Sequence, residues 1–179
     1  MLQRDKTALL LIDIQGILAR TVHEANLILV NWQKLIKAAR LFQLPIILVE
    51  QNPAGLGPTI PELRELLGDL EPIEKMTFNG CLQKELLPGI RETGREQLLV
   101  AGIEAHVCVY QTVRGLLKEP YQIHLASDAV SSRTSWNRTM ALKRMRELGA
   151  IISSTEMALF ELMGSSEDDL FRQFIRIVK

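Results

Sequence analysis

The chain has 179 residues, 47% of them hydrophobic and 23% charged, which is ordinary for a globular protein with a proper core. Its 21 basic residues balance its 21 acidic ones, so charge gives no reason to expect binding to nucleic acid or to a membrane surface. The two cysteines have no C-x-x-C spacing, and residues 1–6 lack the apolar core of a signal peptide. No apolar run approaches the roughly 20 residues of a membrane span. We therefore expect a single cytoplasmic domain over residues 1–179.

Short runs rich in Leu, Ile and Val recur along the chain and predict six strands. Most of these runs are apolar throughout rather than alternating, which is typical of parallel strands covered on both faces. They cover residues 7–13, 44–50, 72–75, 97–101, 122–127 and, more weakly, 151–153.

Segments with helical periodicity separate the strands. They cover residues 28–39, 82–87 (stopped by Pro88-Gly89), 107–118, 135–148 (ended by Gly149) and 167–178 (capped by Ser166). In the fourth, basic residues alternate with Trp136 and Met140 at helical spacing, which favours a solvated helix face over a phosphate-binding one. The alternation of strands and helices predicts βαβ units, and therefore a three-layer α/β/α domain with a mostly parallel, Rossmann-like sheet of about six strands.

One long irregular stretch, residues 51–61, directly follows the second strand and contains three prolines. Loops of this length in compact domains are usually functional or disordered. The prolines and aliphatic residues favour an ordered wall at the carboxyl edge of the sheet.

The most informative residue is Cys108, which lies where the fourth strand gives way to a helix. Free N–H groups and the positive end of a helix favour the thiolate, and ligands bind at strand ends in open α/β sheets. A cysteine nucleophile also needs a base. Asp13 ends the first strand and Lys75 ends the third, although Asp13 could equally cap a turn and Lys75 could be an edge charge.

Five segments, taken in order, resemble the isochorismatase-like cysteine hydrolases. Residues 11–15, 75–78 and 102–108 resemble the family's three catalytic motifs in order and spacing. Residues 50–59 and 126–133 resemble the subgroup of isochorismatase-domain-containing proteins. The resemblance covers essentially the whole chain and implies the isochorismatase-like hydrolase fold.

The resemblance implies roles for individual residues. Cys108 would be the nucleophile that forms a thioester, Asp13 the general base and later acid, and Lys75 the cation that favours both anions. A cis peptide between Ile103 and Glu104 would aim the N–H of Glu104, with that of Cys108, at the substrate oxyanion. Many relatives carry Thr where this chain has Glu104, whose carboxylate could repel acids or join subunit contacts.

Other residues are expected to bind the substrate. Gln51 follows the second strand, Leu56 and Phe78 could wall the pocket or be plain core, and Gln111 lies one helical turn after Cys108. The nicotinamidase branch of the family binds a metal through an Asp-x-His after the second strand, where this chain has Gln51 and Asn52. We therefore expect no metal and no cofactor.

These features favour a cofactor-independent hydrolase of a small amide or ureide. Hydrolysis of isochorismate itself breaks a vinyl ether and does without the cysteine, so Cys108 indicates an acyl substrate. Two alternatives stay open: a catalytically silent relative that acts as an oligomeric binding or scaffold module, and a peroxide-sensing thiol, which a low pKa of Cys108 would permit. The resemblance also implies a homo-oligomer.

Overall fold

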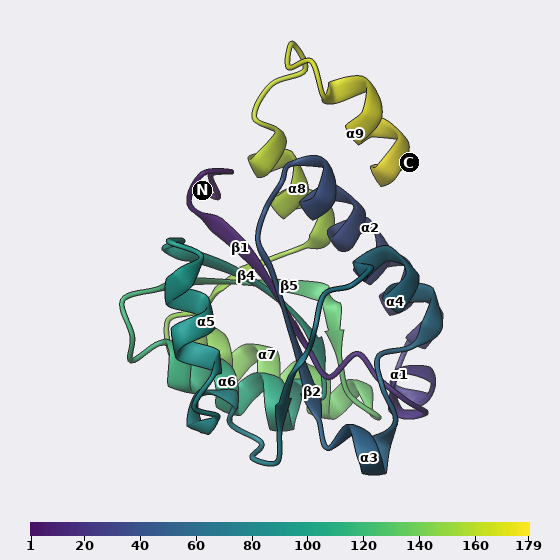
Figure 1. Ribbon diagram of the computed structural model, residues 1–179, viewed down its shortest axis with the longest axis vertical. Helices are drawn as coiled ribbons and strands as arrows, with labels where there is room; N and C mark the ends of the chain where they lie inside the picture. Colours follow the sequence, from purple (N-terminus) through teal and green to yellow (C-terminus); the bar gives the residue numbers. More distant parts are fainter.

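A computed structural model describes residues 1–179 and contains one parallel sheet of six strands between two layers of helices (Figure 1). The strand order is β3-β2-β1-β4-β5-β6. The predicted three-layer α/β/α fold is confirmed. The strands are β1 (Thr7–Ile12), β2 (Ile46–Gln51), β3 (Ile73–Lys75), β4 (Gln97–Ile103), β5 (Gln122–Ser131) and β6 (Ile151–Ser153).

Alternate side chains of the central strand β1 enter two separate hydrophobic cores. Leu9 and Leu11 pack toward one helical layer, whereas Leu10 and Ile12 pack toward the other. The first layer contains α1 (Leu18–Thr21), α2 (Ala25–Leu41), α4 (Pro61–Leu67), α8 (Thr155–Met163) and α9 (Phe171–Val178). The second contains α5 (Leu86–Glu92), α6 (Tyr110–Leu116) and α7 (Ser135–Glu147).

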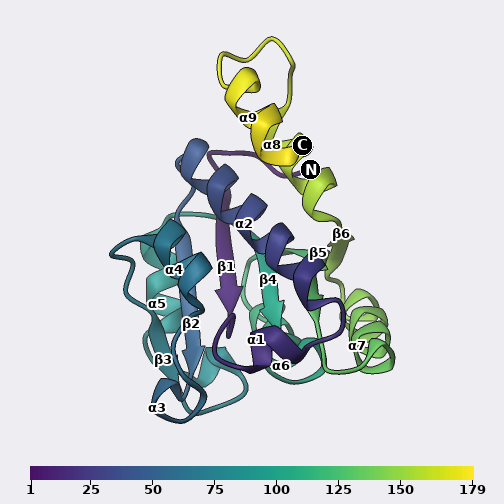
Figure 2. The same ribbon diagram turned by 90° about the vertical axis from the view of Figure 1, so that its right-hand side faces the viewer.

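The two ends of the sheet differ in what covers them. In Figure 2 α8 and α9 stand at the amino end of the strands, close to the N-terminus, whereas α1 and α3 (Pro53–Leu56) lie at the carboxyl end. The chain moves outward from β1 to β3 and then returns to β4 on the other side of β1. The carboxyl ends of β1 and β4 therefore form the topological switch point, where open α/β sheets bind ligands. None of the helices is both long enough and apolar enough to traverse a bilayer.

Strand β5 extends further than its apolar run, to Ser131, because its pairing with β4 resumes at Val130 after a bulge. Side chains from both layers hold the bulged backbone: Trp32 Nε1 donates to the carbonyl of Ala129, and Arg138 Nη2 donates to that of Ser127. The polar residues that made this part of the sequence look unlike a strand thus belong to a bulge that both helical layers hold in place.

Two predicted helix boundaries are wrong. Pro88 does not stop a helix but lies in the first turn of α5, where a missing N–H costs no intrahelical hydrogen bond. The last helix begins at Phe171 and not at residue 167, because Asp168 accepts a hydrogen bond from the N–H of Leu170 and pairs with Arg4. That pattern makes a turn of the acidic segment.

The apolar side chains of helix α7 point in two directions. Ala141 and Met145 are its buried residues, whereas Trp136 and Met140 are exposed. Two large apolar side chains therefore face outward from an otherwise basic helix.

Candidate active site

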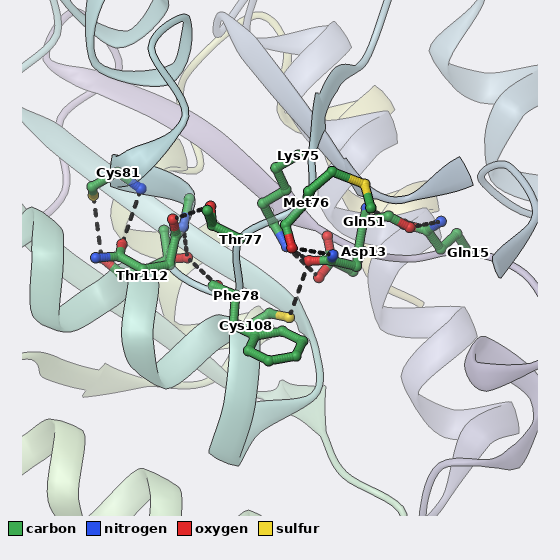
Figure 3. A network of polar contacts seen from close by, with 12 residues as sticks. Asp13, Gln15, Gln51, Lys75, Met76, Thr77, Phe78, Cys81, Cys108 and Thr112 are labelled. Carbon is green, nitrogen blue, oxygen red and sulfur yellow. Dashed lines mark hydrogen bonds and ion pairs between the residues drawn. The ribbon is translucent and has the colours of Figure 1, made fainter. Parts of the chain in front are cut away.

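Four polar side chains at or beyond the carboxyl ends of four strands converge at the switch point (Figure 3). Asp13 comes directly after β1, Gln51 ends β2 and Lys75 ends β3. Cys108 follows β4, in a π-helical turn (Ala105–Val109) that leads into α6. The structure thus brings together the three residues predicted to be catalytic, together with Gln51.

Lys75 lies at the centre of this cluster and contacts two of its members. Its Nζ lies 2.9 Å from Oδ2 of Asp13 and 2.7 Å from Oε1 of Gln51. The Lys75 side chain is 0% exposed and the Asp13 side chain 3%. A buried charge is tolerated only when it is paired and hydrogen-bonded, and Lys75 satisfies both conditions. Gln51 is oriented in turn, because its Nε2 donates to the carbonyl oxygen of Met76.

The Cys108 thiol lies beside this ion pair. Its Sγ is 4.0 Å from Oε1 of Gln51, and Oδ1 of Asp13 is buried without a hydrogen-bond partner. Burial and the nearby Asp13 carboxylate raise the pKa of the Cys108 thiol to about 12, against the opposing effect of Lys75. Burial likewise raises the pKa of the Asp13 carboxyl, although Lys75 and the thiol oppose the shift.

The expectation of a low Cys108 pKa is therefore wrong. The positive end of the following helix does not compensate for the loss of water around the sulfur and for the adjacent carboxylate. The resting thiol is neutral, and the peroxide-sensing alternative loses the low pKa on which it depended.

A glycine allows the two strand ends to approach this closely. Gly102 pairs with Ile12 across β1 and β4 and has a φ of +135°. A Cβ atom at Gly102 would lie 2.0 Å from the carbonyl oxygen of Ile12. Asp13 itself has a φ of 53°, a left-handed conformation that is costly for a residue with a side chain and that is often found at functional sites. The peptide bond between Ile103 and Glu104 is cis.

Gln15 is a site residue that the sequence analysis did not single out. Its Nε2 donates to the carbonyls of Gln51 and Gly57, and its Oε1 accepts from the N–H of Gln51. The buried amide thereby joins the segment after β1 to the end of β2 and to the loop beyond it. A polar residue two positions after an apolar strand was the available signal, but it is equally typical of a turn.

A cavity of about 160 Å³ opens beside the sulfur. This volume is well below the roughly 300–1,000 Å³ of pockets that take drug-sized ligands, so it suits a small molecule. Three of the four predicted substrate-binding residues line it, but Gln111 does not, because it lines a separate hollow with Asn79 and Arg114. The lining residues are Asp13, Gln15, Leu18, Gln51, Leu56, Phe78, Glu104, Val107 and Cys108.

Glu104 forms part of the cavity wall. Its Oε2 accepts hydrogen bonds from the backbone N–H and from Nε of Arg133, each at 3.1 Å. His106 Nδ1 lies 4.0 Å from the same oxygen and 3.0 Å from Oγ of Ser132. No group of three or more His, Cys, Asp or Glu side chains is arranged to hold a metal ion.

The fold and the position of the cluster define a doubly wound α/β protein with a thiol, a carboxylate and an ammonium gathered at its switch point. The model of the isochorismatase domain matches residues 7–157, and the chain belongs to this family.

Three similar proteins illustrate the relationship. Human isochorismatase domain-containing protein 2 is 38% identical over 150 residues, which cover 82% of this chain and 70% of the relative. The structure of Pseudomonas aeruginosa YcaC with hexane-2,5-diol and covalent acrylamide has a TM-score of 0.93 at 27% identity and covers 99% of this chain and 89% of that one. The Escherichia coli YcaC gene product, described as an octameric hydrolase of unknown specificity, has a TM-score of 0.90 at 25% identity over 99% of this chain and 94% of that one.

Proposed function

We propose that this protein is a cofactor-independent cysteine hydrolase that acts on a small amide or ureide through a thioester intermediate. Membership of the isochorismatase family supports a hydrolase-type function. The observation that carries the proposal is the asymmetric use of the Asp13 carboxylate. Lys75 occupies Oδ2, Oδ1 is buried without another hydrogen-bond partner, and the Cys108 thiol interacts with the same carboxyl group.

In the proposed first step Asp13 accepts the thiol proton while Sγ of Cys108 attacks the substrate carbonyl carbon. The raised pKa of Asp13 makes it a stronger base than an ordinary carboxylate. Lys75, 2.9 Å from Asp13, favours the thiolate as it forms. The backbone N–H of Glu104 makes no hydrogen bond to a carbonyl group of a loop, turn or helix cap. It is therefore free to stabilise the oxyanion.

The following steps return the proton. Protonated Asp13 gives it to the departing nitrogen, the C–N bond breaks, and the acyl group remains on Cys108 as a thioester. Asp13 then removes a proton from an incoming water, which attacks the thioester and releases the acid and the thiol. The cycle therefore needs no external oxidant, reductant or cofactor, but it does need a reduced Cys108, which a cytoplasmic location would maintain.

The similar proteins support this chemistry in part. The P. aeruginosa relative is described with covalent acrylamide, and such an adduct requires a nucleophile in that protein. The octameric E. coli relative supports a homo-oligomer here as well. The exposed Trp136 and Met140 on α7 suit such an assembly, because aromatic residues and Met are enriched in interfaces.

The test is a screen of small amides, ureides and hydroxamates for release of ammonia or acid, with trapping of the acyl-enzyme by intact mass measurement. Cys108→Ala is the blank, and Cys81→Ala is the matched control because Cys81 does not line the cavity. We expect turnover and a mass adduct in the wild type and in Cys81→Ala only. Turnover that survives Cys108→Ala would refute the mechanism, and an inert thiol across the screen would favour the non-catalytic alternative.

A further inference from the structure

The charged groups that line the cavity are all of one sign. Asp13 and Glu104 are carboxylates, and no lysine, arginine or histidine is among the lining residues. Lys75, the ion-pair partner of Asp13, is fully buried and does not line the cavity. The ion pair with Lys75 offsets the charge of Asp13, so Glu104 contributes the negative charge that an incoming molecule meets at the cavity wall.

The partner of Glu104 does not cancel this charge on the cavity side. The Glu104 side chain is 10% exposed, whereas that of Arg133 is 64% exposed. Both hydrogen bonds from Arg133 go to Oε2, and Oε1 accepts none from the protein. Water and salt screen the exposed guanidinium more effectively than they screen a carboxylate in a narrow cavity.

The neutral lining residues do not reverse the polarity. Both amide hydrogens of Gln15 are engaged, with the carbonyls of Gln51 and Gly57. Gln51 directs its amide oxygen toward Lys75 and Cys108. The remaining walls are aliphatic or aromatic side chains.

We propose that this pocket admits small neutral or cationic acyl compounds and rejects carboxylates of the same shape, with Glu104 as the residue that determines this selectivity. The inference deepens the proposed function by naming its substrate class. Its physical basis is the repulsion between like charges in a partly dry cleft, which costs far more than in bulk water. The position of Glu104 on the cavity wall favours repulsion of acids over a role in subunit contacts alone.

The test uses two alkylating reagents of nearly the same size, neutral iodoacetamide and anionic iodoacetate. The rate of each at Cys108 is measured at low salt by peptide mass, and their ratio is compared with the ratio at N-acetylcysteine in the same buffers. We expect the preference for iodoacetamide at Cys108 to exceed that of the free thiol by about threefold to tenfold. Added salt should reduce the excess.

Two variants should move the ratio in opposite directions. Glu104→Gln keeps a hydrogen-bond acceptor for Arg133 but removes the charge, so the excess should fall to less than half. Arg133→Ala removes the partial compensation and should increase it. Glu92→Gln, an exposed position on α5, is the matched control and should leave the ratio unchanged.

The outcomes separate this inference from the proposed function, because alkylation requires no turnover. A ratio equal to that of the free thiol, or one that Glu104→Gln and Arg133→Ala both leave unchanged, would overturn the inference even if amides are hydrolysed. A charge-dependent ratio in a protein that hydrolyses nothing would support the pocket selectivity and refute only the hydrolase. The ratio at Cys81 and the thermal midpoint report whether each variant is folded, and Arg133→Ala remains informative if Glu104→Gln does not fold.

Discussion

The two oxygens of Asp13 have different surroundings, and this difference explains why a neutral thiol and a competent nucleophile are compatible. Oδ2 accepts a hydrogen bond from Lys75, whereas Oδ1 is buried without a hydrogen-bond partner and can accept a proton. Because the carboxyl and the thiol interact, they titrate as a coupled pair. The proton rests on sulfur and can move to Asp13 when a carbonyl is in place, so a high thiol pKa in the resting protein does not argue against nucleophilic catalysis.

Replacing Asp13 should separate thiol reactivity from catalysis. Asp13→Asn leaves the burial of Cys108 but removes the carboxylate that helps to raise the thiol pKa to about 12. We expect the pH profile of iodoacetamide labelling to move to lower pH, while hydrolysis falls about 10²- to 10⁴-fold because the base is lost. Labelling rates between about pH 6 and about pH 10 and steady-state assays measure both effects.

The control for this experiment is Asp69→Asn, an exposed carboxylate that does not line the cavity. It should change neither the labelling profile nor the activity. An unchanged labelling profile in Asp13→Asn would mean that the two groups are not coupled.

The Cys108 thiol should also make stability depend on pH. Its pKa is raised from 9.0 to about 12 in the folded protein, so above pH 9 the unfolded chain loses a proton that the native protein keeps. Stability therefore falls as pH rises through this range. Cys108→Ala lacks this effect. Between about pH 8 and about pH 10, the wild type should therefore lose about 1.4 kcal/mol more of its free energy of unfolding than the variant does.

Urea unfolding at the two pH values measures the difference. The other cysteine, Cys81, whose pKa is raised to about 11, is present in both proteins and cancels. An equal dependence on pH in wild type and variant would show that Cys108 ionises in the native protein as readily as in the unfolded chain.

At the scale of the strands, the close approach of β1 and β4 depends on Gly102. Gly102→Ala would place a methyl group 2.0 Å from the carbonyl oxygen of Ile12. We expect a loss of more than about 3 kcal/mol in the free energy of unfolding, because backbone must move to relieve the contact. Gly94→Ala is the control, since Gly94 also has a positive φ but has nothing within 4 Å of its Cβ position.

Gly94→Ala isolates the conformational penalty of an alanine at positive φ, about 1–2 kcal/mol. Chemical denaturation followed by circular dichroism measures both variants. If the two substitutions cost the same, then the contact between the strands is not what requires glycine at position 102.

The sequence predicted the sheet and the convergence of Asp13, Lys75 and Cys108, because each residue lies at or after the carboxyl end of a predicted parallel strand. It did not predict what depends on tertiary contacts. The thiol pKa reflects burial and the neighbouring carboxylate. Gln111 was expected on the face of Cys108, but the extra residue in each turn of a π-helix rotates the positions that follow. In the sequence Gln15 resembles an ordinary turn residue, and only its three tertiary hydrogen bonds distinguish it.

At the scale of the whole molecule, the two ends of the sheet are free to serve different purposes. The site occupies the carboxyl end, and α9 is held at the amino end by Phe174, whose ring stacks 5.7 Å from that of Phe42. Helix α7 lies along the second layer, and its outward side chains take no part in either core. Its exposed apolar residues are therefore available for contact with another chain.

The proposed homo-oligomer can be tested on α7. Trp136 is 71% exposed, and Met140 lies one turn further along the helix. Trp is among the residues most enriched at the energetic centre of interfaces, and its removal commonly costs about 2 kcal/mol or more of binding energy.

Light scattering tests this interface. We expect a mass that is a multiple of 20.2 kDa for the wild type and a smaller mass for the double variant Trp136→Glu with Met140→Gln. Leu27→Gln, an exposed apolar residue on α2, should leave the mass unchanged. A monomeric wild type would contradict the assembly, and an unchanged mass in the double variant would exclude α7 from its interface.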